Sequence, residues 1–349
     1  MLDESAVPLA TLTTLRVGGP ARRLVTAETE DELVGVVRDL DAAGEPLLLL
    51  GGGSNVVVPD EGFDGTVVRV ATRGVAPCVD GCSGATVTVA AGEPWDDLVA
   101  RAVEEGWVGV EALSGIPGLT GATPVQNVGA YGQDVSQTVA RVRTYDRDAG
   151  ALRTLTAAEC GFGYRSSLLK DALRGGSPRW VVLDVTFQLR LGSLGAPVAY
   201  AELARALGVA KGGRAPLGEV RRAVLGLRRG KGMVHDDADP DSWSAGSFFT
   251  NPVLDAAAAA RLPEDAPRYP EADGRTKTSA AWLIERAGFA KGYGAGPARL
   301  SSRHTLALTN PGGATSADVL RLAREVRDGV RARFGVDLVP EPVLVGATL

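Results

Sequence analysis

Apolar and polar positions in the N-terminal half of the chain predict several strands and a few helices. The segments with strand character are 22–27, 47–50, 65–70, 85–92, 139–145 and 180–190. Thr29 and Glu32 have the spacing of a capping box, and the amphipathic helix that follows is expected to end at Gly44. A second helix is expected from Pro94, which suits a first helical turn, to Gly106. Because strands and helices do not alternate regularly, the pattern predicts an α+β fold.

The C-terminal half is richer in predicted helices. They are expected at 200–208, 216–229, 256–260 and 278–288, and from a Ser316 cap to Gly335. The last segment, 336–349, is expected to form a terminal strand.

Glycine accounts for 45 of the 349 residues, and part of it gathers in the segment LLLLGGGSNVVV, residues 47–58. Here a buried strand runs into three glycines, and their peptide N–H groups could bind a pyrophosphate. Val56 stands where the common dinucleotide fingerprint needs its third glycine, and the ending of a Walker loop is missing. The segment is therefore either an unusual phosphate loop or a plain glycine turn.

A second glycine-rich stretch, SGIPGLTGATPVQNVGAYG, covers residues 114–132 inside the irregular region 109–132. Irregular stretches of this length in a domain are uncommon and usually functional. Its apolar residues Ile116, Val125 and Val128 argue against a long surface loop, which is the alternative. Two such loops, neither of the Rossmann type, favour an extended dinucleotide, and FAD fits that description.

Composition excludes several classes of function. The net charge of −5 gives no reason to expect nucleic acid as a partner, and no apolar run approaches the roughly 20 residues of a membrane span. The three cysteines, Cys78, Cys82 and Cys160, make a disulfide framework or a zinc site improbable and favour a reducing cytoplasm. The two histidines, His235 and His304, are too few for a histidine-rich metal site or a charge relay, so a proton donor must be sought among Ser, Tyr, Glu, Lys and Cys.

The same residues carry ordinary structural expectations. His235 lies in a charged loop and is expected to be exposed, whereas His304 precedes an apolar strand and faces either the core or a ligand. Cys78 and Cys82 are expected to be structural.

Four residues could carry chemistry, and each also has a plain structural interpretation. Ser247, in WSAGSFFTNP, is a possible proton donor or a polar residue at a strand end. Arg165 could bind a carboxylate through two hydrogen bonds or form a surface ion pair. Glu341 stands between two prolines that would fix its carboxylate, unless it is simply solvated at a domain edge. Lys231 could meet a phosphate or be solvated at a helix end.

The order of these motifs resembles one family, the UDP-N-acetylenolpyruvoylglucosamine reductases of peptidoglycan precursor synthesis. The matching segments are TTLRVGG (13–19), LLLLGGGSNVVV (47–58), GIPGLTGATPVQNVGAYG (115–132), FGYRSS (162–167), AGSFFTNP (245–252), AAWLIERAG (280–288) and PEPVLVG (340–346). They follow the family order and span nearly the whole chain. The combination of GSFF-x-NP with P-x-QN-x-GAYG is the most specific part.

The resemblance implies a two-lobed FAD-binding region of the vanillyl-alcohol-oxidase type and a separate α+β substrate-binding domain. The expected lobes are 1–70 and 71–213, the substrate domain is 214–335, and 336–349 returns as a strand toward the active site. The residues that the resemblance assigns to non-covalent FAD are Gly51, Gly52, Gly53, Ser54, Asn55, Ser114, Gly115, Ile116, Pro117, Gly118, Gly121, Ala122, Gln126 and Asn127. Those that it places near the substrate are Tyr131, Tyr200, Lys231, Asn251, Lys277 and His304.

The implied reaction is the reduction of UDP-N-acetylglucosamine enolpyruvate to UDP-N-acetylmuramate, with NADPH as the hydride donor to FAD. Hydride passes from flavin N5 to the terminal carbon of the enolpyruvyl group, and Ser247 looks like the donor of a proton to the α-carbon. Arg165 and Glu341 resemble the pair that polarises the substrate carboxylate, a role for which Glu341 needs a raised pKa. Tyr200 resembles the tyrosine that one class of the family closes over the diphosphate. A cytoplasmic monomer without metal, nucleic acid or membrane contacts is expected.

Two departures and two alternatives accompany this interpretation. Pro342 replaces the valine that usually follows the family glutamate, and Thr250 stands where many relatives carry Lys or Arg. Another flavoenzyme of the same fold would often attach flavin through His or Cys, and neither glycine-rich loop contains one. A non-catalytic nucleotide-sugar-binding relative would be expected to lack one of the three catalytic candidates.

Overall fold

The computed structural model describes residues 2–349, which form two units with separate hydrophobic cores. The first unit contains the chain up to Val7, Ala21–Gly53 and Phe63–Gly230, and the second contains Pro8–Pro20, Ser54–Gly62 and Lys231–Leu349. Two short stretches of the predicted first flavin lobe, Pro8–Pro20 and Ser54–Gly62, therefore group with the second unit. The predicted lobes are continuous ranges of the chain, so they do not contain this grouping. The predicted lobes and the separate substrate domain stay predictions.

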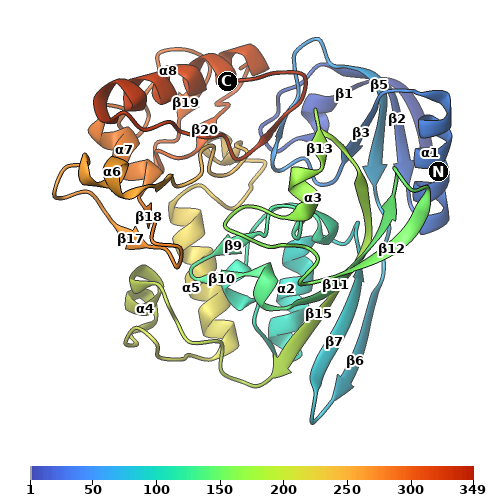
Figure 1. Cartoon of the computed structure of the whole chain (residues 1–349), viewed down its shortest axis with the longest axis horizontal. Coiled ribbons are helices and arrows are strands. Elements are labelled where there is room, and N and C mark those ends of the chain that lie inside the picture. Colours follow the sequence, from blue (N-terminus) through green and yellow to red (C-terminus); the bar gives the residue numbers. More distant parts are fainter. Residues whose placement is uncertain (1) are drawn as a thin grey trace. The chain divides into compact units, whose positions relative to one another are not determined.

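One sheet of the first unit has the strand order β1-β2-β5-β3 (Figure 1). Its strands are β1 (Leu2–Pro8), β2 (Pro20–Ala27), β5 (Phe63–Val70) and β3 (Leu47–Leu50). Strands β2 and β3 run parallel to β5, and helix α1 (Glu30–Ala43) lies between them in the chain. The predicted capping box of Thr29 and Glu32 is present, and Gly44 ends the helix in the left-handed conformation. The buried face of α1 packs into the same core as β2 and β5, so these predicted elements are confirmed.

The other sheet of this unit is antiparallel, with the order β12-β11-β15-β7-β6, and β8 also pairs with β15. Its strands are β12 (Ala151–Thr156), β11 (Val139–Asp146), β15 (Trp180–Leu191), β7 (Gly84–Ala90), β6 (Val75–Asp80) and β8 (Trp107–Val108). Trp95 begins helix α2 (Trp95–Glu104), and its ring lies 5.8 Å from the ring of Phe187 on β15. Pro94 is the N-cap of α2 rather than a residue of its first turn, because its ψ of 130° is extended.

The first unit contains further short elements, some of them within the long irregular region. They are η2 (Glu111–Leu113), η3 (Thr120–Ala122), β9 (Gly129–Ala130), β10 (Gln133–Asp134), η4 (Val135–Gln137), α3 (Leu168–Asp171), β13 (Leu173–Arg174), β14 (Ser177–Pro178), α4 (Ala201–Leu207) and α5 (Leu217–Gly230), where η denotes a 3-10 helix. The helices predicted at 200–208 and 216–229 are confirmed as α4 and α5.

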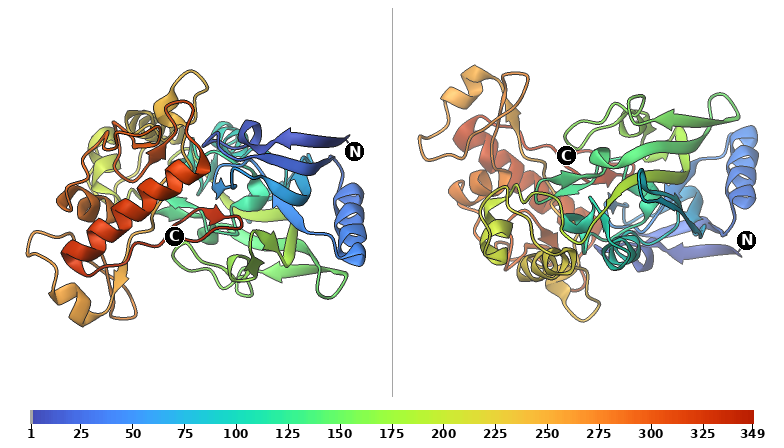
Figure 2. Two further views of the ribbon diagram at one scale, coloured as in Figure 1. Left: turned by 90° about the horizontal axis from the view of Figure 1, so that it is seen from above. Right: turned by 90° about the horizontal axis from the view of Figure 1, so that it is seen from below.

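The second unit is built around α8 (Ser316–Phe334), the long helix seen along its length in Figure 2. Its other elements are η1 (Leu9–Leu12), β4 (Val56–Val57), η5 (Pro240–Ser242), β16 (Val253–Leu254), α6 (Ala256–Ala260), β17 (Tyr269–Pro270), β18 (Thr276–Lys277), α7 (Ala280–Arg286), β19 (Arg299–Leu300), β20 (Leu308–Thr309) and β21 (Val343–Leu344). The predicted helices at 256–260 and 278–288 are confirmed as α6 and α7.

Two terminal features of this unit differ from the prediction. The cap of α8 is Thr315, which forms a capping box with Asp318, whereas the hydroxyl of Ser316 donates to the carbonyl oxygen of Val58. The expected strand at 336–349 is limited to β21, which pairs with β4, and to a single bridge between Pro340 and Phe249. Proline has no N–H to donate, so this segment cannot form a long ladder.

Cys78 and Cys82 are exposed free cysteines, while Cys160 is buried. His235 is partly buried rather than exposed, with its Nε2 3.2 Å from the Asp237 carboxylate. Among residues 2–349, no group of three or more His, Cys, Asp and Glu side chains is arranged to hold a metal ion. Within the same residues, no helix is long and apolar enough to span a membrane.

Candidate active site

The two glycine-rich loops of the first unit lie in direct backbone contact. Gly51–Gly53 follows β3, and a Cβ atom added to Gly52 would lie 2.7 Å from the Cα atom of Gly118. Real Cβ atoms do not approach backbone this closely, so a side chain at Gly52 would push the loops apart. Gly53 and Gly118 also have positive φ angles of 62° and 112°, which glycine adopts without strain.

The second loop is tied to the connection between β7 and α2. The carbonyl oxygen of Gly118 accepts a hydrogen bond from the N–H of Trp95 at 3.0 Å, and the N–H of Gly121 donates to Ala91 at 2.9 Å. Ile116 packs partly buried against the main core of this unit, as do Val125 and Val128. The region is therefore not a surface loop, as its apolar residues predicted.

The start of this loop is held by Asp96, in the first turn of α2. The Asp96 carboxylate accepts the N–H of Gly115 at 2.6 Å and a bidentate pair of hydrogen bonds from Arg221 on α5, at 2.6 and 2.8 Å. Burial acts to raise the pKa of Asp96, but the hydrogen bonds from Arg221 and Gly115 hold that pKa below its usual value. The carboxylate is thus charged at neutral pH and fixes the loop to both helices.

Two buried polar atoms of the second loop fit a bound polar molecule. Thr120 Oγ1 and Gln126 Oε1 are buried and make no hydrogen bond to any residue in 2–349. Buried polar atoms in native proteins are nearly always hydrogen-bonded, so a ligand with polar groups suits this place. Asn127, also predicted to bind the cofactor, uses its amide within the protein: Nδ2 donates to Gly163 at 2.9 Å, and Oδ1 accepts from Ser136 at 3.0 Å.

Tyr131 occupies the turn of a tight hairpin formed by β9 and β10. Tyr131 and Gly132 have φ angles of 51° and 88°, and positive φ at both central residues is what a type I′ turn requires. The Tyr131 ring meets the ring of Tyr200 edge-on, with centroids 6.2 Å apart. Tyr200 is half exposed at the start of α4, so two predicted substrate residues lie together.

Arg165 is held by the base of the same hairpin. Its guanidinium donates to the carbonyl oxygens of Gly129 at 2.7 Å and of Asn127 at 3.3 Å. Arg165, Asn127 and Tyr131 all have positive φ, a conformation that costs a non-glycine residue roughly 1 to 3 kcal/mol. Such strain persists only where surrounding contacts impose it, and it is common at functional sites.

Arg228 is a charged residue that the sequence motifs did not single out. Burial lowers the pKa of Arg228 to about 10, while the nearby Tyr131 and Asp96 oppose that change. Burial also raises the pKa of Tyr131 to about 12, with Glu202 adding to the rise and Arg228 opposing it. At neutral pH this pair is a buried cation beside a neutral phenol. The signal was present in the sequence, because Arg228 continues the buried face that Leu217, Val220 and Val224 form on α5.

The candidate proton donor lies in the second unit, beside the candidate glutamate. Ser247 precedes the buried Phe248, whose carbonyl oxygen accepts the N–H of Glu341 at 2.8 Å. Asn55 Nδ2 lies 3.4 Å from the carbonyl oxygen of Glu341, and the Asn55 carbonyl accepts the N–H of Val343. The fold thereby brings together three predicted site residues, two of which, Asn55 and Glu341, are 286 positions apart in the chain.

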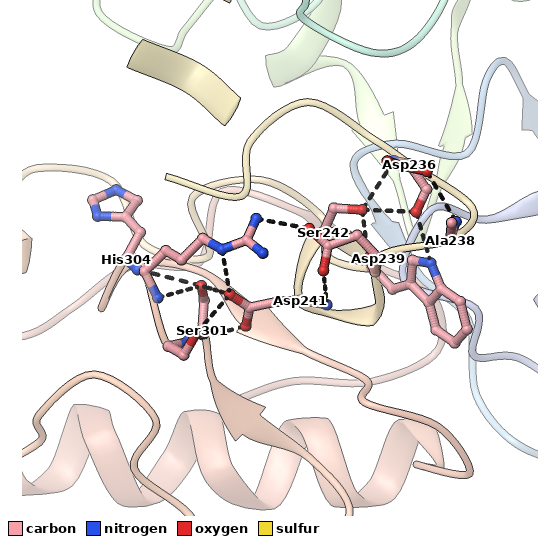
Figure 3. A network of polar contacts seen from close by, with 10 residues as sticks. Asp236, Ala238, Asp239, Asp241, Ser242, Ser301 and His304 are labelled. Atoms are coloured by element: carbon pink, nitrogen blue, oxygen red, sulfur yellow. Dashed lines mark hydrogen bonds and ion pairs between the residues drawn. The ribbon is translucent and has the colours of Figure 1, made fainter. Parts of the chain in front are cut away.

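The other predicted substrate residues of this unit differ in how they are held. Lys277 forms an ion pair with Glu271 at 2.5 Å, and Asn251 Oδ1 accepts the N–H of Ala280 at the start of α7. His304 belongs to a turn that Figure 3 shows in contact with Asp241. The Ser301 hydroxyl of this turn donates to the Asp241 carboxylate at 3.0 Å.

Lys231 lies close to the same carboxylate-bearing segment. A Cβ on its neighbour Gly232 would be 3.1 Å from the main-chain oxygen of Asp241. The segments that carry Lys231 and His304 therefore both lie against Asp241.

Comparison with known proteins identifies the family. The C-terminal domain model of UDP-N-acetylenolpyruvoylglucosamine reductase matches residues 239–345. The UDP-N-acetylenolpyruvoylglucosamine reductase of Thermobifida fusca is 58% identical over 98% of this chain and 98% of that protein. The chain belongs to the UDP-N-acetylenolpyruvoylglucosamine reductase family.

Further members of the reductase family are also similar to this chain over nearly its whole length. The protein of that name from Cutibacterium acnes is 58% identical over 98% of this chain and 90% of its own length. The crystal structure of the reductase from Thermus caldophilus covers 99% of both chains with a TM-score of 0.66 at 29% identity. The predicted α+β class is confirmed.

The predicted cofactor is also confirmed. An FAD binding domain model matches residues 21–156, a range that contains both glycine-rich loops. FAD is therefore the cofactor of this reductase family member, with NADPH as the reductant. The close glycine contact and the buried polar atoms of Thr120 and Gln126 suit that assignment.

Asp96→Asn is expected to weaken FAD binding. The change removes the charge that holds Gly115 and leaves Arg221 without its carboxylate, and losing a charged hydrogen bond of this kind corresponds to about a tenfold rise in Kd. Titration of the apoprotein with FAD, followed by quenching of flavin fluorescence, measures the change.

Asp146→Asn is the matched control, because Asp146 on β11 also accepts a bidentate pair from an arginine, Arg179. It is expected to lower thermal stability without changing the Kd for FAD. Equal FAD affinity of Asp96→Asn and the unchanged protein would contradict the role of Asp96.

Proposed function

We propose that this chain reduces UDP-N-acetylglucosamine enolpyruvate to UDP-N-acetylmuramate. The observation that carries the proposal is the hydrogen bond from the N–H of Glu341 to the carbonyl oxygen of Phe248 at 2.8 Å. It sets a glutamate beside the segment that carries the Ser247 hydroxyl in a member of this reductase family. Residues Gly51–Asn55 and Ser114–Asn127 would hold FAD, which when bound supplies the hydride that reduces the enol ether.

The reaction places negative charge on the substrate carboxylate and its α-carbon, and Arg165 suits that charge. A guanidinium is always cationic, and its planar fork can donate two parallel hydrogen bonds to a carboxylate. Its anchoring on the carbonyl oxygens of Gly129 and Asn127 limits its motion, which favours pre-organised stabilisation of developing charge. Glu341 would assist by holding a proton on, or sharing one with, the substrate carboxylate.

Ser247 would give its proton to the α-carbon. A serine hydroxyl is a weak acid, but an enolate carbon is a strong base, so transfer is feasible when the two are held in line. A neutral donor also adds no charge to a site that must accept an anion. The left-handed Gly246, with φ 73°, sharply turns the chain just before this hydroxyl.

Two features of the first unit support an anionic substrate. Arg228 supplies a buried positive charge, and the neutral phenol of Tyr131 beside it can donate a hydrogen bond. We assign Tyr131, Tyr200, Lys231, Asn251, Lys277 and His304 to substrate binding.

The proposal includes a monomeric enzyme of the cytoplasm. The exposed thiols of Cys78 and Cys82 support a reducing compartment, because exposed cysteines persist as free thiols there. The monomeric state follows from the sequence resemblance alone.

The purified protein is expected to be yellow, to bleach anaerobically with NADPH and to recover its colour when UDP-N-acetylglucosamine enolpyruvate is added. Recovery reports transfer of the two electrons from the flavin to the enol ether, and absorbance near the flavin maximum follows it. The matched control is UDP-N-acetylglucosamine, which lacks the double bond. A fully loaded flavin that stays bleached with the enolpyruvate would reject the proposed reaction.

Ser247→Ala is expected to leave reduction of the flavin by NADPH intact and to slow re-oxidation by substrate. Loss of a general acid lowers a rate by about 100-fold or more. Stopped-flow absorbance separates the two half-reactions. The control is Ser177→Ala, a partly buried serine on β14 that binds Arg147; re-oxidation of Ser247→Ala at the control's rate would remove Ser247 from the mechanism.

Arg165→Lys is expected to lower kcat by about tenfold or more, because lysine keeps the charge but cannot donate two hydrogen bonds in one plane. Steady-state turnover at saturating substrate measures it, with flavin content checked first. Near-normal turnover would show that the bidentate geometry is not used.

A further inference from the structure

Glu111 is a buried carboxylate that receives hydrogen bonds from three separate segments of the first unit. Only 1% of the surface of Glu111 is exposed to solvent. Oε2 accepts the N–H of Gly109 at 2.7 Å, while Oε1 accepts Nε2 of Gln133 at 2.9 Å and the N–H of Ala196 at 2.5 Å. Its donors are thus two backbone N–H groups and one side-chain amide.

Three contacts of Glu111 lead to parts of the proposed active site. The Ser114 hydroxyl, at the start of the second flavin loop, donates to the main-chain oxygen of Glu111 at 2.7 Å. Gln133 pairs with Ala130 across the hairpin whose turn holds Tyr131. Ala196 lies four positions before Tyr200 in the chain. Glu111 therefore links the flavin loop, the Tyr131 hairpin and the segment that carries Tyr200.

Residues 195–211, here called the Tyr200 segment, pack into a small hydrophobic cluster of their own. Val198 and helix α4 form this cluster with Ala112 and α5. Val198 also exchanges main-chain hydrogen bonds with the 212–213 turn. The polar contact of Ala196 with Glu111 is a connection that ties this peripheral cluster to the hairpin.

The residues around the Glu111 carboxylate are packed too closely to take a different arrangement. A Cβ on Gly195 would lie 2.9 Å from Glu111 Oε1, and a Cβ on Gly132 would lie 2.7 Å from the Cβ of Ala199. The segment thus approaches both Glu111 and the hairpin turn through glycines. Its edge-on contact between Tyr200 and Tyr131 depends on this spacing.

We propose that Glu111 is a positioning residue that sets Tyr200 against Tyr131 and thereby tunes affinity for the diphosphate-containing substrate. Its carboxylate oxygens bind donors of the protein itself, so it acts through the two tyrosines. The inference rests on the proposed function for its substrate. Glutamate suits the role because a carboxylate has only acceptors, and the three neighbours that meet it are donors.

Glu111→Gln is the direct test. The amide has the same shape, but its NH₂ group must face at least one N–H donor, which leaves that contact unmet. We expect KM for UDP-N-acetylglucosamine enolpyruvate to rise by about tenfold, with kcat and the Kd for FAD within about threefold of the unchanged holoenzyme.

Asp146→Asn is again the control, since it also removes a buried carboxylate with several donors, but on β11. A merely structural effect would lower the melting temperature of both variants and leave both KM values unchanged. If Glu111→Gln does not fold, Glu111→Asp keeps the charge, withdraws it by one methylene from Ala196, and is expected to raise KM in the same direction. An unchanged KM in the folded variant would overturn the proposal, as would equal losses in KM, kcat and FAD affinity.

A second measurement does not use the substrate. Trypsin can cleave after the exposed Arg205 and Lys211 in the Tyr200 segment. Cleavage there in holoenzyme is expected to be faster in Glu111→Gln than in Asp146→Asn, because the segment has lost its attachment. Equal cleavage rates would overturn the positioning role even if the proposed reaction is correct, while faster cleavage in a protein inactive toward the enolpyruvate would reject only the reaction.

Discussion

Backbone contact between Gly52 and Gly118 is the constraint on which the cofactor region depends. At 2.7 Å from a Cα atom, no side-chain carbon can be accommodated at Gly52, so any other residue would separate the two loops. Each loop is then fixed from its other side. The first follows a buried strand, and the second is held by hydrogen bonds from Trp95 and by the charged Asp96. Two segments without regular secondary structure thus have a defined arrangement, as a cofactor site requires.

The proposed substrate side of the first unit depends on strained backbone and buried charge. Asn127, Tyr131 and Arg165 adopt left-handed conformations that L-residues rarely take, and hydrogen bonds among their own segments hold them there. Arg228 keeps a cation near the Tyr131 phenol despite its burial. Glu111 then attaches the Tyr200 segment to this arrangement through Ala196. Each of these arrangements fixes a polar group at a cost in folding stability, which is typical of sites that bind charged ligands.

The second unit brings together a serine and a glutamate that come from distant segments of the chain. Edge-on packing of Phe248 with Phe249, at 5.3 Å between centroids, anchors the residues after Ser247 in the core. The N–H of Glu341 then bonds to this anchored segment. Pro340 and Pro342 flank the glutamate, remove two N–H donors and keep the strand short, while the N–H of Glu341 between them still makes this contact.

The sequence by itself determined the local elements and the family, whereas tertiary packing decided the boundaries and the grouping of residues into a site. The capping box at Thr29, the apolar run before Gly51 and the helical face on α5 need only neighbouring residues, so the order of residues is enough to predict them. The motif order also led to FAD. The cap of α8 is Thr315, in a capping box with Asp318, while the Ser316 hydroxyl donates to Val58 instead. The C-terminal strand is short because β21 pairs with β4 alone. Ala196 meets Glu111 across 85 positions of chain. Spacing along a sequence specifies what a residue does to its own turn or strand, but only tertiary packing specifies which remote donor reaches a buried carboxylate.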